Sequence, residues 1–138
     1  MNEAQRYRSA ITGSLDLLKL GKEQEALKLL DDAIAVAIQK GDRSSVVCTL
    51  CHHGAVLCHM SGNLSHAKRY YEQSLRSIPE NPMALFGLAR VALDQGDAIT
   101  ARQYAKRSYD ATVSGDDEIA KRGLLDMIAK HWPDIAAE

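Results

Sequence analysis

The sequence predicts an all-α protein built from about three copies of a helical hairpin and one further helix. The main evidence for repeated hairpins is a pair of residues, a glycine followed five residues later by an alanine. This pair occurs three times, at successive offsets of 41 and 34 residues. Aromatic residues make up only 5% of the chain, and alternating β-branched runs are nearly absent, which argues against strands. A spacing in the thirties is typical of helical hairpins that bury their apolar faces by stacking on one another. The three pairs are Gly21 with Ala26, Gly62 with Ala67, and Gly96 with Ala101.

Length, composition and charge predict a single globular domain, residues 1–138. Apolar residues make up 46% and charged residues 25% of the chain, values typical of chains that bury a core. The net charge of −1, with Lys and Arg spread along the chain, argues against binding to nucleic acid. The longest strongly apolar run, residues 33–38, is far shorter than the ~20 residues of a membrane span. Because the N-terminus is polar and shows no signal core, we expect a cytoplasmic protein without membrane insertion.

Most of the predicted helices begin at a polar residue that can cap them. A capping side chain accepts hydrogen bonds from the free N–H groups of the first turn. Asn2 and Gln5 have the spacing of a capping box, and Pro82 suits the first position of a helix because its fixed φ is already helical. The expected caps are, in chain order, Asn2, Asp42, Asn63, Asn81, Asp97 and Ser114 (with Asp117 three residues on), and the second helix begins near Glu23.

Glycines and prolines mark the predicted ends of the helices. Glycine permits the positive φ of a tight turn after a helix, and proline cannot continue the helical hydrogen-bond pattern. The expected ends are Gly21, Gly41, Gly62, Pro79, Gly96 and Pro133. Seven helices result, arranged as repeats at about residues 5–40, 44–79 and 81–112 and a capping helix at about 115–131.

Residues of similar character fall at the same distance from each glycine. A large residue in the second helix of each copy would fill the space inside the hairpin, and a small residue further on would allow the next hairpin to approach. The large residues are Leu29, Tyr70 and Tyr104, and the small ones are Ala33, Ser74 and Ser108.

This pattern resembles the tetratricopeptide repeat, a helix–turn–helix unit of 34 residues. The resemblance covers about residues 5–112 and includes Pro79 at the end of a second helix, while the run 35–43 resembles the extended repeats of kinesin light chains. It implies a right-handed superhelical array of antiparallel helix hairpins, an α-solenoid, closed by the capping helix. The resemblance also implies that the protein is an interaction module, an adaptor or scaffold. The sequence shows no nucleophile–base–acid set, so we do not expect an enzyme.

In such arrays the first helix of each hairpin lines a concave groove that holds a peptide segment of a partner. Phe86 would be either the apolar anchor of this groove or a core residue, and Arg8 and Arg90 could pair with acidic groups. His52 and His53 would gain charge near pH ~6.5 and favour acidic partners at lower pH. The groove candidates are Arg8, Ile11, Thr12, Leu15, Thr49, His52, His53, Val56, Met60, Met83, Phe86 and Arg90.

Self-assembly into a scaffold through exposed repeat ends is an alternative function that would make the protein a homo-oligomer. The one tryptophan, Trp132, follows the last helix beside His131 and Pro133, and an exposed tryptophan often marks an interface. The same side chain could instead fold back onto the last hairpin, and the sequence leaves both arrangements open.

The segment Cys48–His59 carries a cofactor-like pattern. Cys48, Cys51 and His52 form a Cys-x-x-Cys-His run, the form of a c-type haem attachment site. A zinc site would use Cys48, His52 and His59 on one helix face, but the segment spans roughly 16 Å along a helix, too far for one ion. Cys51 and Cys58 fall instead on the face assigned to contact between helices, as small apolar residues. A metal or haem carrier is therefore a remote alternative, and we expect reduced thiols, no metal and no cofactor.

Overall fold

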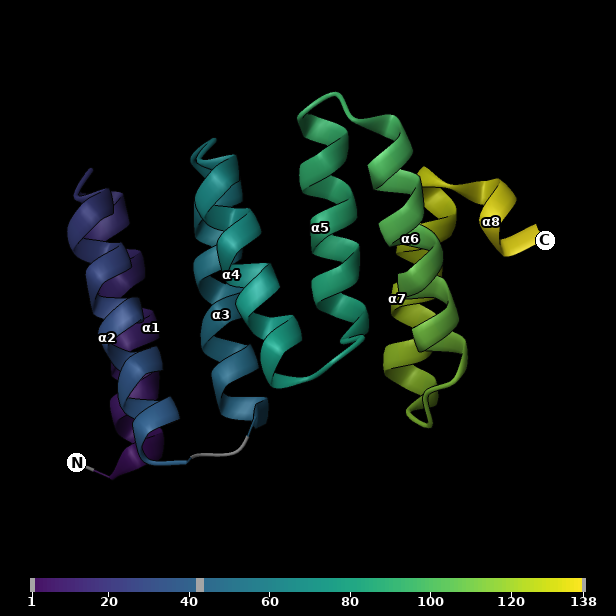
Figure 1. Cartoon of the computed structure of the whole chain (residues 1–138). Coiled ribbons are helices and arrows are strands. Elements are labelled where there is room, and N and C mark those ends of the chain that lie inside the picture. The colour runs from purple at the N-terminus through teal and green to yellow at the C-terminus, as the bar shows by residue number, and fades with distance from the viewer. Residues whose placement is uncertain (1, 42–43, 138) are drawn as a thin grey trace. The chain divides into compact units, whose positions relative to one another are not determined.

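The computed structural model describes residues 2–41 and 44–137, and these form helices and turns without a strand (Figure 1). This confirms the all-α fold class. Among the described residues there are eight helices, one more than the seven predicted. They are α1 (Glu3–Lys19), α2 (Glu23–Gln39), α3 (Ser44–Met60), α4 (Leu64–Ser77), α5 (Pro82–Asp94), α6 (Ala98–Val113), α7 (Glu118–His131) and α8 (Pro133–Ala137).

The helices fall into two compact units, Met1–Ile78 and Pro79–Glu138. In the first unit α1 lies against α2 and α3 against α4, and α3 also contacts α1 and α2. In the second unit α5 lies against α6, which also contacts α7 and α8. Within each unit, helices that are neighbours in sequence are therefore neighbours in space, as in helical repeats.

The turn inside each hairpin has one repeated geometry. At the second turn Gly62 has a φ of +82°, and the N–H of Asn63 donates to the carbonyl of Cys58 at 2.8 Å. This is the Schellman pattern, which requires a left-handed residue after the helix and so favours glycine. Gly21 and Gly96 adopt the same geometry, with φ of +76° and +82°. The recurring glycines therefore mark the turns that the sequence predicted.

The alanine of each pair lies where the two helices of a hairpin meet. Ala26, Ala67 and Ala101 are at most 1% exposed. In the second hairpin, Gly54 on α3 is the matching small residue opposite Tyr70, because a β-carbon at position 54 would lie 2.9 Å from Cζ of that ring. Small side chains thus allow the close approach of helices that the repeat pattern indicated.

The second unit has a core in which Phe86 and Trp132 meet. Their rings are T-shaped with centroids 6.3 Å apart, and the two side chains are 4% and 8% exposed. Of the two arrangements that the sequence left open for Phe86, the structure therefore shows the core position and not the groove anchor, because the ring packs inside the unit. The side chain of Trp132 is also buried, so it is not the exposed tryptophan that would have suggested self-assembly. The other buried members of this core are Ala89, Ala92, Ala101, Ala105, Leu124, Ile128 and Ile135.

Two details of the C-terminal part differ from the prediction. α7 ends just before Pro133, as expected, but Pro133 also begins a further helix, α8, and Ile135 on this short helix is fully buried in the core. Asp117, rather than Ser114, is the N-cap of α7, with its Oδ1 accepting from the N–H of Ile119 and of Ala120 at 3.1 Å. Ser114 cannot cap α7 because α6 extends to Val113 and uses Ser114 as its C-cap.

The remaining predicted caps are confirmed where the structure describes them. Asn2 and Gln5 form both hydrogen bonds of a capping box, at 2.8 and 3.0 Å. The side chains of Asn63, Asn81 and Asp97 each accept from a first-turn N–H group. The expected cap at Asp42 lies outside the described residues.

Candidate functional site

A groove between α1 and α3 brings three of the predicted groove residues together. Its cavity has a volume of about 230 Å³. Tyr7 and Leu50 form an apolar floor and are themselves buried, at 7% and 1% exposure, while Ile11 is half-buried and can still contact a ligand. We call this the α1–α3 groove; its lining residues are Ala4, Tyr7, Arg8, Ile11, Ser45, Val46, Thr49 and Leu50.

Arg8 and Thr49 give the rim of this groove its polar character. Both side chains are exposed, and the hydroxyl of Thr49 donates to the carbonyl of Ser45, one turn earlier, at 2.8 Å. Within the part of the chain that the structure describes, Arg8 forms no ion pair. The groove therefore combines an apolar floor with one available positive charge.

The other predicted residues of the first unit do not line this cavity. Thr12, Leu15 and Met60 are exposed, the last two at 40% and 77%, and Val56 is half-buried. They lie on the same helices as the α1–α3 groove, so they are available to a longer ligand but do not form a pocket with it.

The two histidines have different surroundings. His53 is exposed, whereas His52 is half-buried, with its ring 6.4 Å from that of Tyr71 and 6.2 Å from that of His53. Burial, together with the neighbouring His53, lowers the pKa of His52. The expected charging of His52 near pH ~6.5 is therefore moved to lower pH.

In the second unit Met83 lines a separate cavity of about 270 Å³ between α5, α6 and α7. Its floor includes Pro82 and Leu124, and its charged lining residues are Asp116, Asp117 and Lys121. The predicted residue Arg90 is exposed on α5 but does not line this cavity. We call it the α5–α7 pocket.

The sequence analysis missed several residues of these two cavities. Tyr7, Val46 and Leu50 lie on the same helices as the predicted positions, three or four residues from them, so helical spacing could have identified them. Asp116 and Asp117 gave no such sign, because acidic residues at the start of a helix are expected from the helix dipole alone.

The cysteines are free, buried thiols. Burial is the main cause that raises the pKa of Cys51 and of Cys58 to about 12, so neither is a thiolate near neutral pH. The thiol of Cys48 donates to the carbonyl of Ser74 at 3.4 Å. These side chains fill space between helices, as their positions in the repeat indicated.

Neither a metal site nor a membrane-spanning helix is found among the described residues. No group of three or more His, Cys, Asp or Glu side chains in this part of the chain is arranged to hold a metal ion. No described helix combines the length and apolar character that crossing a membrane requires.

Comparison with known proteins identifies the repeat. Residues 61–116, from the end of α3 to the segment before α7, match the family model described as tetratricopeptide repeat. The chain is also 28% identical over 130 residues to the "Cellulose synthase operon protein C" of Pseudomonas fluorescens (strain SBW25). The match covers 93% of this chain and 10% of that protein, so the chain spans about a tenth of the relative's length.

Proposed function

We propose that this chain, which carries the tetratricopeptide repeat over residues 61–116, holds a short segment of a partner protein in the α1–α3 groove. The observation that supports this is the joining of Arg8, Ile11 and Thr49 around one apolar cavity. Repeats of this kind are protein-interaction modules in general, and a groove between first helices suits an extended or helical peptide.

The composition of the groove suggests what the partner segment would offer. An apolar side chain would insert above Tyr7 and Leu50, because these buried residues leave a floor without charged groups. A carboxylate beside that side chain would pair with the guanidinium of Arg8. Such an apolar anchor with one adjacent charge is the usual form of an energetically important contact.

The α5–α7 pocket would add a second contact of opposite charge. Its apolar lining is bordered by Asp116, Asp117 and Lys121. Because Lys121 is paired with Glu118 at 3.7 Å, the two aspartates favour an apolar side chain next to Lys or Arg. Asp117 already accepts two backbone hydrogen bonds as the cap of α7, which leaves Asp116 as the freer carboxylate. One contact to a negative group and one to a positive group would select partners by their charge pattern.

The relative indicates no particular pathway for this chain. Its printed name places it in a cellulose synthase operon, yet the shared segment is a small part of that protein and in this chain forms hairpins. A role in cellulose synthesis is therefore not proposed. The adaptor and scaffold roles, self-assembly and a cytoplasmic location stay predictions.

The experiment compares two variants with the same change of charge. In the groove variant Arg8→Glu is combined with Ile11→Glu, and in the control Lys28→Glu is combined with Gln24→Glu on the exposed side of α2. Each protein is expressed in its native cell and purified by affinity, and co-purifying proteins are quantified by mass spectrometry. Circular dichroism checks that both variants keep the helical fold.

We expect the groove variant to lose partners that the wild type and the control retain. If the groove variant keeps every partner of the wild type, the α1–α3 groove is not the binding site. A binding partner that is found can then be divided into peptides to locate its apolar and acidic residues.

A further inference from the structure

A second cavity of the first unit lies on the second helices of the hairpins. It has a volume of about 210 Å³ and lies between α2 and α4, on other helices than the α1–α3 groove. In contrast to that groove its lining is polar, with Asp31 on α2 and six residues of α4, among them Arg69, Gln73 and Arg76. We call it the α2–α4 cavity.

The floor of this cavity is held in place by Tyr70. Its ring lies against Gly54 of α3, and its hydroxyl donates to Oδ1 of Asp31 at 2.6 Å. This hydrogen bond joins α4 to α2 across the cavity, and Tyr70 is only 5% exposed. The carboxylate of Asp31 is therefore partly used inside the protein.

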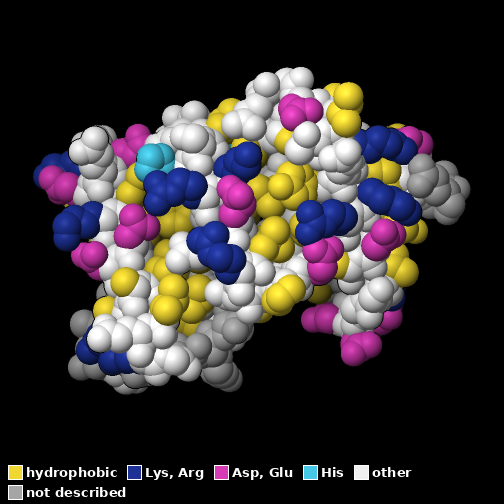
Figure 2. All heavy atoms as spheres, viewed as in Figure 1, with side chains coloured by type: hydrophobic (Ala, Val, Ile, Leu, Met, Phe, Trp, Pro, Cys, Tyr) yellow, Lys and Arg dark blue, Asp and Glu magenta, His cyan; other side chains and the backbone are white. Residues whose placement is uncertain are grey.

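Two cations of α4 lie at this cavity without an ion pair. Within residues 2–41 and 44–137, neither Arg69 nor Arg76 forms a salt bridge, and both are exposed. On α6, by contrast, Arg102 is paired with Asp134 at 2.7 Å. Figure 2 shows Lys and Arg side chains, a histidine and one acidic side chain gathered over α4.

The spacing of the two arginines fits an extended chain. They are seven residues apart on α4, which places them on one face with about 10.5 Å of rise between them. An extended peptide in the polyproline II conformation has three residues per turn and advances about 3.1 Å per residue, so two carboxylates three residues apart lie on one face of it, about 9 Å apart. Each carboxylate could then accept hydrogen bonds from one guanidinium.

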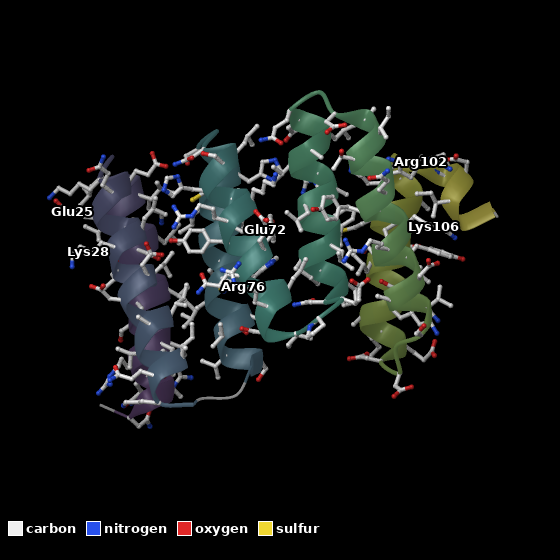
Figure 3. All side chains as sticks on the ribbon, viewed as in Figure 1. Glu25, Lys28, Glu72, Arg76, Arg102 and Lys106 are labelled. Atoms are coloured by element: carbon white, nitrogen blue, oxygen red, sulfur yellow. The ribbon has the colours of Figure 1, made fainter. Side chains whose placement is uncertain are left out.

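Other groups of the cavity suit the backbone of such a peptide. Glu72 projects from α4 on the same side as Arg76 (Figure 3) and can accept from a peptide N–H group. Gln73 can both donate and accept. A free phosphate ion would gain nothing from Glu72 and Asp31, whose charges repel it, whereas an acidic peptide offers N–H groups as well as carboxylates.

We propose that the α2–α4 cavity binds an extended acidic segment of a protein, with carboxylates three residues apart on Arg69 and Arg76. This site is separate from the α1–α3 groove and does not depend on that groove being occupied. It gives the first unit a second interaction surface, on its α2 and α4 side.

The test uses a fluorescent twelve-residue peptide with Glu at every third position among Ser and Gly. A second peptide carries Gln in place of Glu, and inorganic phosphate serves as the competing ion. Binding is followed by fluorescence polarisation with the full chain at low salt. The site variant combines Arg69→Gln with Arg76→Gln, and the control, with the same loss of charge, combines Arg102→Gln with Lys106→Gln on α6.

We expect the Glu peptide to bind at least tenfold more tightly to the wild type and the control than to the site variant, with the Gln peptide weak throughout. Ile11→Glu, which changes only the α1–α3 groove, should leave this binding unchanged, so the two sites are tested separately. Equal binding by the site variant and the control would overturn the proposal. Displacement of the peptide by phosphate at equal concentration would also overturn it, since the site would then be a simple anion site.

Discussion

The ring of Tyr70 lies directly on the backbone of Gly54, so that a β-carbon at position 54 would be 2.9 Å from Cζ and 3.0 Å from both Cε atoms. The hydroxyl of the same ring is held by Asp31 at 2.6 Å. The ring is therefore fixed at both ends and cannot move away from α3. In the first hairpin Gly13 has a similar neighbour, because a β-carbon there would lie 2.9 Å from Cδ2 of Leu29.

Gly54→Ala is expected to destabilise the first unit. Overpacking against a fixed side chain typically costs about 1–3 kcal/mol, while replacing a helical glycine by alanine stabilises by about 1 kcal/mol. We expect a net loss of up to about 2 kcal/mol in the free energy of unfolding. Urea denaturation followed by circular dichroism measures it.

Gly13→Ala is the matched control for this substitution. Its neighbour is the end of the flexible Leu29 side chain, which can rotate away, so we expect a neutral effect or a gain of up to about 1 kcal/mol. A similar loss in both variants would contradict the role given to the ring of Tyr70.

Alkaline pH should destabilise the protein through its buried thiols. Burial raises the pKa of Cys51 and Cys58 from 9.0 to about 12. Above pH ~9 the unfolded chain loses these protons while the folded protein keeps them, so stability is constant below pH 9 and falls as the pH rises towards 12. Each thiol adds a slope of up to about 1.4 kcal/mol per pH unit.

The thiol effect is measured by urea denaturation between pH 7.5 and 10.5. We expect Cys51→Ala to lower stability at pH 7.5, because it leaves a small cavity, but to show a shallower decline above pH 9 than the wild type. If both proteins decline with the same slope, Cys51 does not carry the effect.

Acidic pH should destabilise the protein through His52. Its folded pKa is lowered, first by burial and then by His53, so the unfolded chain binds a proton more readily. The stabilising contribution is complete above pH ~6.5 and is lost as the pH falls through the lowered folded pKa. His52→Gln should therefore reduce the loss of stability between pH 7 and 5, and NMR titration of the ring protons gives the pKa directly. A folded pKa at or above 6.5 would contradict this.

The repeated turns could be predicted from the sequence because local chemistry decides them. The left-handed conformation at Gly62 and its equivalents and the first-turn hydrogen bonds of Asn2 depend on residues within a few positions. Asp117 shows the limit of this reasoning. From the sequence, either Ser114 or Asp117 could cap α7. The length of α6 decides between them, because α6 uses Ser114 as its own C-cap.

The sequence left the environment of Phe86 open for a reason that lies far from this residue in the chain. Helical spacing gave its position on α5, but its environment depends on Trp132 and on α8, more than forty residues later. A five-residue helix that begins with proline is too short to show a helical periodicity of its own. The candidate site was predictable where a pocket uses neighbouring turns, as at Arg8 and Ile11, and not where a distant segment completes the core.

Phe86→Ala is expected to unfold the second unit more easily and to leave the α1–α3 groove intact. Removing a buried aromatic side chain typically costs about 3–5 kcal/mol, and here it also removes the T-shaped contact with Trp132. Since Trp132 is the one tryptophan, its fluorescence reports the unfolding of this core, and the midpoint in urea should fall clearly. Arg90→Ala, an exposed residue on the same helix, should change stability by less than about 0.5 kcal/mol. If the urea unfolding transition followed by Trp132 fluorescence is unchanged in Phe86→Ala, the ring does not stabilise the core. Phe86 would then again be a candidate for contact with a partner.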